Sequence, residues 1–155
     1  MIDRELWQNA SDSAIIDHIL PRYHDTHRRQ LEELLPLAEK VSTVHEGKFP
    51  AEVLPLLQAI QGELLSHMMK EERILFPMLK QGAGAAAMPV RMMMHEHAEH
   101  NAALERLLEI TGNLQAPANA CRSWQRLYSL ARELVDDLHD HIELEDHILF
   151  ARVLA

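Results

Sequence analysis

The sequence contains one ten-residue pattern twice, and this repeat restricts the folds that the chain can adopt. Residues 67–76 read HMMKEERILF and residues 141–150 read HIELEDHILF, so His-x-x-x-Glu-x-x-Ile-Leu-Phe recurs 74 positions later. A second pair, HDTHRRQLEELL at 24–35 and HAEHNAALERLL at 97–108, recurs at an offset of 73. The members of the two pairs follow one another in the same order, which indicates a duplicated helical hairpin.

Four amphipathic segments, separated by stretches with Gly and Pro, carry these repeats. Their apolar residues recur every three or four positions, which is typical of helices that bury one face. Ala, Leu, Glu and Met are plentiful, whereas aromatic residues make up only 5%, and this balance favours helix over sheet. Short connections favour antiparallel neighbours, so we expect an all-α, up-down-up-down four-helix bundle. The expected helices run from about Ser13 to Val44, Pro50 to Lys80, Pro89 to Thr111 and Asn119 to Leu154.

The composition restricts the partners and the location of the protein. A net charge of −9 and the lack of a Lys/Arg run argue against nucleic acid and anionic membranes as partners. No apolar run reaches about 18 residues, and the first residues lack the features of a signal peptide. The single Cys121 forms no intrachain disulfide, so we expect a cytoplasmic protein. We expect residues 1–12 to be an N-terminal extension and residues 13–155 to be one domain, while the oligomeric state stays open.

Polar side chains occupy stripe positions at which leucine is the usual residue. His67 and Glu71 in one helix, and His141 and Glu145 in another, continue the apolar stripes of their segments. The spacing i, i+4 places each imidazole and carboxylate on one helix face, a turn apart. Burial of an ionised glutamate is costly unless a cation compensates its charge. Two such pairs that face each other across a bundle therefore predict a metal site.

The other helix of each hairpin adds a histidine to this site. The pattern leaves His24 and His27 as alternatives, and likewise His97 and His100, because positions i and i+3 share a face. The expected site then holds four imidazoles and two carboxylates, and no thiolate. If the carboxylates bridge, this set serves two metal ions and leaves room for a bridging oxygen and an external molecule. Such nitrogen and oxygen ligands suit iron best, ahead of manganese or zinc.

These motifs resemble those of the hemerythrin-like (HHE cation-binding) family, whose pattern is H…HxxxE…H…HxxxE. The stretches YHDTHRRQLEELL, SHMMKEERILFPMLKQG, EHAEH and DDLHDHIELEDHILF are most similar to the di-iron iron–sulfur cluster repair proteins of the YtfE/ScdA/NorA type. The resemblance covers about residues 15–155, without the N-terminal Cys-containing domain that is usual in the repair proteins. It implies a hemerythrin-like bundle in which six residues bind metal: His24, His67, Glu71, His97, His141 and Glu145.

The same resemblance implies a cofactor and a function. The cofactor is a pair of iron ions with an oxo or hydroxo bridge, across which Glu71 and Glu145 also bridge. Glu63 and Glu96 match acidic residues beside the cluster, where they would affect access to it. The implied function is a nitrosative and oxidative stress response, in which the protein binds nitric oxide or reactive oxygen species and supplies iron to damaged iron–sulfur proteins. The alternative is a reversible oxygen or nitric oxide sensor or carrier without catalytic turnover.

Overall fold

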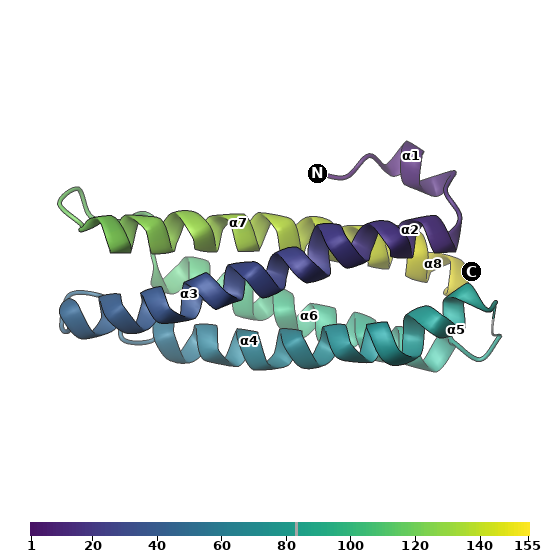
Figure 1. Ribbon diagram of the computed structural model, residues 1–155, viewed down its shortest axis with the longest axis horizontal. Coiled ribbons are helices and arrows are strands. Elements are labelled where there is room, and N and C mark those ends of the chain that lie inside the picture. Colours follow the sequence, from purple (N-terminus) through teal and green to yellow (C-terminus); the bar gives the residue numbers. More distant parts are fainter. Residues whose placement is uncertain (83) are drawn as a thin grey trace.

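The computed structural model describes residues 1–82 and 84–155, most of which lie in four long helical rods (Figure 1). A short helix, α1 (Arg4–Gln8), precedes them. The first rod joins α2 (Asp12–Ile19), η1 (Leu20–His24) and α3 (Asp25–Val44), and the second joins α4 (Val53–Lys70), η2 (Glu71–Leu75) and α5 (Phe76–Lys80). The third rod is α6 (Ala87–Ile110), and the fourth joins α7 (Arg122–Leu144), η3 (Glu145–Leu149) and α8 (Phe150–Leu154).

The rods pack as an antiparallel bundle. Helix α3 lies between α4 and α7 and contacts both, while α4 also contacts α6 on its other side. The described part of the chain contains no strand, so the predicted all-α four-helix bundle is confirmed. Among the same residues, no helix combines the length and the apolar character that crossing a membrane requires.

Three of the rods contain a π-helical turn, which the sequence analysis did not predict. In these turns an N–H bonds to the carbonyl five residues earlier instead of four, as from Phe76 to Glu71 and from Phe150 to Glu145. Pro21 lies inside the first of them, η1, whereas α3 continues past Pro36. A π turn inserts one extra residue into a helix and is frequent at functional sites. The three turns therefore indicate a functional site at their position along the bundle axis.

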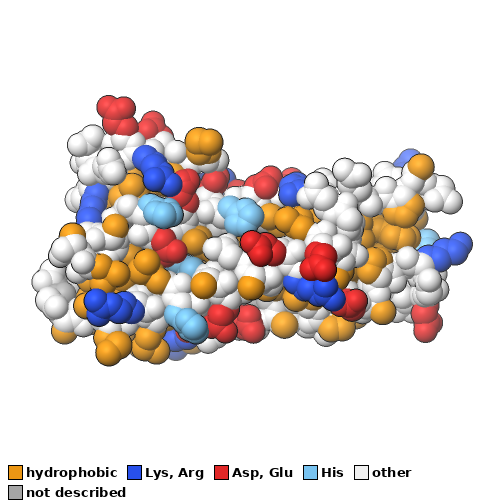
Figure 2. All heavy atoms as spheres, turned by 180° about the vertical axis from the view of Figure 1, so that it is seen from behind, with side chains coloured by type: hydrophobic (Ala, Val, Ile, Leu, Met, Phe, Trp, Pro, Cys, Tyr) orange, Lys and Arg blue, Asp and Glu red, His pale blue; other side chains and the backbone are white. Residues whose placement is uncertain are grey.

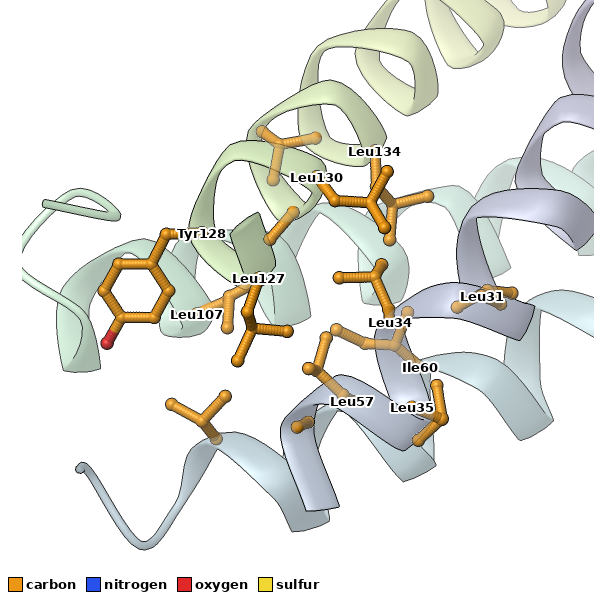
Figure 3. Packing of buried hydrophobic residues seen from close by; sticks show 14 of the residues in the cluster. Leu31, Leu34, Leu35, Leu57, Ile60, Leu107, Leu127, Tyr128, Leu130 and Leu134 are labelled. Carbon is orange, nitrogen blue, oxygen red and sulfur yellow. The ribbon is translucent and has the colours of Figure 1, made fainter. Parts of the chain in front are cut away.

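Two apolar clusters fill the bundle above and below that level. The larger cluster joins the long helices α3, α4, α6 and α7, and Figure 3 shows its leucines interdigitating between them. The smaller cluster joins α2, η2, α5, α8 and the start of α6. Members of the larger cluster include Leu34, Leu57, Leu107, Leu127 and Leu134, and members of the smaller include Ile16, Leu75, Phe76, Val90 and Phe150.

The surface is mixed in character, and the first residues lie against the last rod. On the face that carries α6, acidic, histidine and apolar side chains are interspersed (Figure 2). Near the N-terminus, the guanidinium of Arg152 donates to the backbone carbonyls of Trp7 and Gln8 and pairs with Asp12. The terminal amine of Met1 lies 2.9 Å from a carboxylate oxygen of Asp140 in α7.

Candidate metal centre

Six buried polar side chains meet between the two apolar clusters. They form two groups of four, within each of which the ligand atoms all lie within 4.8 Å of one another. Glu71 and Glu145 belong to both groups, so the groups share their two carboxylates. The first group is His24, Glu71, His141 and Glu145, the second is His67, Glu71, His97 and Glu145, and none of these side chains is more than 2% exposed.

Each rod supplies part of this arrangement, and three supply it at a π turn. His24 is the last residue of η1, while Glu71 and Glu145 are the first residues of η2 and η3. His97 lies within the regular helix α6. The structure therefore brings together all six residues that the resemblance had indicated.

The four imidazoles point the same ring atom toward the carboxylates. Each Nε2 lies within 3.4 Å of an oxygen of Glu71 or Glu145. Each of the four carboxylate oxygens has a different imidazole beside it, so that each carboxylate faces both groups. The distances are 3.1 Å from His24 and 3.4 Å from His67 to Glu71, and 3.0 Å from His97 and 2.9 Å from His141 to Glu145.

The residues fit a pair of cations. Oε2 of Glu71 and Oε1 of Glu145 are buried and have no hydrogen-bond partner, although Nε2 of His97 lies 3.0 Å from the latter without the alignment of a hydrogen bond. An unsatisfied buried acceptor of this kind costs more than about 1 kcal/mol. Positive ions between the imidazoles and the shared carboxylates would satisfy both atoms. The donor set of nitrogen and oxygen, without sulfur, is one that iron accepts.

The pKa values of two histidines show that the buried carboxylates favour positive charge beside them. Burial lowers the pKa of the His97 ring, but its contacts with Asp146 and Glu145 outweigh that effect and raise the pKa to about 10. Burial and the neighbouring charge on His24 instead lower the pKa of His141 well below its usual value. Without metal, a proton held on His97 thus compensates part of the negative charge.

The second nitrogen of each imidazole points away from the centre and has a partner of its own. The Nδ1–H groups of His24, His67 and His97 donate to carboxylates, whereas Nδ1 of His141 meets a further histidine. Such partners fix the ring orientation and, where they are carboxylates, make the ligand more basic. The four contacts are His24 to Glu72 at 2.6 Å, His67 to Glu96 at 2.8 Å, His97 to Asp146 at 2.6 Å and His141 to His27 at 3.0 Å.

Glu72 and Asp146 were missed in the sequence analysis, although the repeat contains a signal for them. Each directly follows the glutamate of a His-x-x-x-Glu motif, so they occupy equivalent positions in the two hairpins. Adjacent residues on a regular helix point about 100° apart, and the stripe pattern alone assigns them to the surface. Only their contacts with His24 and His97 show that they support the centre.

The two pairs of alternative histidines separate clearly. His24 and His97 belong to the groups of four, whereas His27 and His100 lie outside both. Burial is the main cause that lowers the pKa of His27 and of His100 to about 3, so both rings are neutral at physiological pH. They are buried next to the centre as uncharged neighbours.

Glu63 and Glu96 line a cavity of about 310 Å³ between α4 and α6. Glu63 is exposed on the cavity wall, whereas Glu96 connects the cavity with the centre through its hydrogen bond from His67. Glu96 also forms an ion pair with Lys70. The other residues along the cavity are Gly62, Ser66, Glu99 and His100.

Comparison with known proteins identifies relatives of this chain. Residues 15–153 match the family described as the hemerythrin HHE cation binding domain. The iron–sulfur cluster repair protein DnrN of Neisseria gonorrhoeae is 60% identical over 155 residues, which cover 99% of each chain. The iron–sulfur cluster repair protein YtfE of Escherichia coli K12 is 49% identical over 152 residues, which cover 96% of this chain and 69% of that protein. The protein of the same description from Shigella boydii serotype 18 matches to the same extent.

Proposed function

Because the chain belongs to the hemerythrin HHE cation-binding family, we propose that it is a non-haem di-iron protein of the nitrosative and oxidative stress response. It binds nitric oxide or reactive oxygen species at the centre and supplies iron for the repair of iron–sulfur clusters. A bound pair of irons would carry an oxo or hydroxo bridge, and we place the protein in the cytoplasm. The observation that carries the proposal is the pair of buried groups with two shared carboxylates.

Each iron would be held by two imidazoles and by the two shared carboxylates. When bound, the iron pair supplies redox-active Lewis acid sites with positions open to a small molecule. The chain supplies the rest. The rigid helices place the Nε2 atoms, and the two apolar clusters exclude bulk water from both ends of the site. We assign His24 and His141 to one iron and His67 and His97 to the other, with Glu71 and Glu145 as bridges.

Iron is also the cargo in this proposal, so it needs a route to the surface. The cavity beside α4 and α6 has acidic walls, and one of its residues, Glu96, contacts the ring of His67. Glu63, Glu96 and Glu99 bring three carboxylates to this cavity against one cation, Lys70. A surplus of negative charge attracts Fe²⁺ and raises its local concentration. We therefore assign Glu63 and Glu96 to the entry and exit of iron.

The test combines metal analysis with iron transfer. Protein purified without added metal is analysed for iron, and two irons per chain are expected. The iron-loaded protein is then mixed with an apo iron–sulfur enzyme, a sulfide source and a thiol reductant, with and without prior exposure to nitric oxide. Recovery of acceptor activity, together with loss of iron from the loaded chain, is the expected result.

Two controls make the transfer experiment decisive. The Glu71→Leu variant removes one shared carboxylate and should neither hold two irons nor restore the acceptor. An equal amount of free Fe²⁺ in the presence of a chelator measures restoration without the protein. If the loaded chain retains its iron while the acceptor stays inactive, the repair function is wrong. Reversible binding of nitric oxide under those conditions would then favour the sensor or carrier alternative.

A further inference from the structure

The four imidazoles of the centre do not have equivalent partners. His24, His67 and His97 each donate Nδ1–H to a carboxylate, whereas His141 has only the neutral ring of His27 at this position. The two groups of four therefore differ in the number of imidazoles that have a carboxylate partner. In the group of His67 and His97 both imidazoles have carboxylate partners, whereas in the group of His24 and His141 only one has.

A chain of hydrogen bonds fixes the direction of the His141 contact. The carboxylate of Asp137 is an acceptor only, so Gln30 must present its amide nitrogen to it, at 2.8 Å, and its amide oxygen to His27. The Nδ1 of His27, 3.2 Å from that oxygen, must then carry the proton. An imidazole whose one proton lies on Nδ1 accepts at Nε2, so Nδ1–H of His141 donates to Nε2 of His27 at 3.0 Å.

This chain leaves Nε2 of His141 with its lone pair directed at the centre, which is the tautomer that a metal requires. Arg22 supports the far end of the chain, because its guanidinium donates to the other oxygen of Asp137 at 2.9 Å. The tautomer of a buried ligand is thus set from the surface through Asp137, Gln30 and His27.

Comparison of the two hairpins shows which residues accompany the different partners of His67 and His141. Through the offset of 73, Glu96 corresponds to Tyr23 and His100 to His27. Tyr23 has no carboxylate to offer, and its ring stacks on His141 at a centroid distance of 5.1 Å and an angle of 6°. His100 in turn has a buried Nδ1 without a hydrogen-bond partner, and Ala103 stands where the first hairpin has Gln30. Two exchanges, Glu96 against Tyr23 and Ala103 against Gln30, therefore accompany the change of partner.

The chemical consequence follows from the charge of the acceptor. A carboxylate that accepts Nδ1–H increases electron density on the imidazole and strengthens its bond to a metal, whereas a neutral imidazole does so less. We propose that His27 is the positioning residue of His141, and that the His24–His141 half of the centre is the weaker position, which gives up its metal first. This inference rests on the proposed function and states which of the two positions is the more labile.

Stepwise metal binding tests whether the two halves of the centre differ in affinity. In anaerobic titration with Fe²⁺ against a chromophoric chelator, two steps are expected whose affinities differ by about 10-fold or more. The Glu96→Gln variant gives His67 a neutral acceptor, so it should weaken the tighter step by about 10- to 100-fold and bring the two steps together. The His27→Leu variant should weaken only the looser step by a similar factor. Two equal steps in the unsubstituted chain would overturn the inference and leave the two-iron site intact.

Imidazole NMR with Zn²⁺ assigns the steps to residues without any redox chemistry. With one equivalent of Zn²⁺, the ¹⁵N resonances of His67 and His97 should shift before those of His24 and His141. The reverse order overturns the inference. Failure to bind a second ion under any condition overturns both the inference and the two-iron site.

Two further variants separate a positioning role from a merely structural one. His27→Gln retains a side-chain oxygen that accepts from His141, and it should restore much of the looser step that His27→Leu loses. His100→Gln replaces the corresponding residue of the other hairpin, whose Nδ1 contacts no ligand, and both steps should stay within about 2-fold. If His27→Gln and His27→Leu weaken binding equally, or if His100→Gln does so as well, the positioning role of His27 is wrong.

Discussion

Glu71 and Glu145 are the residues that both halves of the candidate centre share. Each carboxylate lies within reach of an imidazole from both groups, and each has one oxygen without a hydrogen bond. A side chain shared in this way differs from an ordinary ligand, because its loss affects two positions at once.

The first prediction follows from this sharing. Glu71→Leu or Glu145→Leu should lower iron content from two ions to less than about one per chain, because both positions lose a charged ligand. Iron analysis and the visible absorption spectrum measure the outcome. Glu109→Leu, which changes an exposed glutamate paired with Arg106, serves as the control and should retain both irons. Full iron content and an unchanged spectrum in either centre variant would show that the carboxylates do not bridge.

A second prediction concerns protons. The pKa of His97 is raised to about 10 in the metal-free chain, so its ring carries a proton at pH 7 that metal binding must displace. Zn²⁺ added to weakly buffered protein should therefore release about one proton or more per chain at pH 7. The release should fall as the pH rises through about 10, since the folded chain then holds this proton less. A pH indicator measures it, and binding without proton release at pH 7 would contradict the raised pKa.

A third prediction separates access from affinity. Glu63 is exposed on the cavity wall and is not a member of either group, so Glu63→Gln should slow Fe²⁺ uptake and leave the equilibrium affinity within about 2-fold. Stopped-flow uptake at low ionic strength measures the rate. Glu105→Gln, on the same helix as Glu96 but not along the cavity, is the matched control. Equal rates in the two variants would remove Glu63 from the iron route.

At the scale of the elements, the sequence predicted the helices well and their local geometry less well. The stripes and the repeat were enough for four helices, because burial of one face dominates both their spacing and their packing. The π turns were not predictable in this way, since a single extra residue per turn leaves the apolar spacing almost unchanged. The partners Glu72 and Asp146 were missed for a related reason, as their role depends on contacts between rods that no pattern within one rod contains.

The π turn η2 leads to a prediction of its own. Ile74, which is 56% exposed, lies in the turn that holds the extra residue. Its deletion should convert η2 to a regular turn and leave Leu75 and Phe76 directed toward the core, so stability should fall by no more than about 1 kcal/mol. Deletion of Glu105 from the regular helix α6 is the control, because it should rotate the buried Leu107 by about 100° out of the core and cost about 1.5–3 kcal/mol. Urea unfolding compares the two deletions, and an equally large loss in both would show that η2 holds no dispensable residue.

At the scale of the whole molecule, the duplication explains the symmetry of the ligands but not their inequality. Two similar hairpins bring equivalent histidines and glutamates to the middle of one bundle, between two separate apolar clusters. The repeat made this convergence predictable, because equivalent residues of two hairpins that pack on each other meet in the middle of the bundle. The different partners of His67 and His141 depend on the positions at which the hairpins diverge, such as Tyr23 and Glu96. Their effect becomes visible only in three dimensions.

The last prediction joins the centre to the stability of the bundle. Removal of metal leaves Glu71 and Glu145 in the core, where a buried charge costs several kcal/mol until a proton on His97 compensates part of it. For a chain of this length about 1 kcal/mol shifts the melting temperature by about 2–4 °C, so chelation should lower it by about 10 °C or more. Without metal, the Glu71→Leu variant should be at least as stable as the unsubstituted chain, because it replaces a buried charge by an apolar side chain. Without metal this variant should melt at or above the temperature of the unsubstituted chain, whereas the iron-loaded unsubstituted chain should melt above both. Calorimetry of the three samples measures these differences, and a melting temperature that chelation leaves unchanged would mean that the bundle does not depend on its centre.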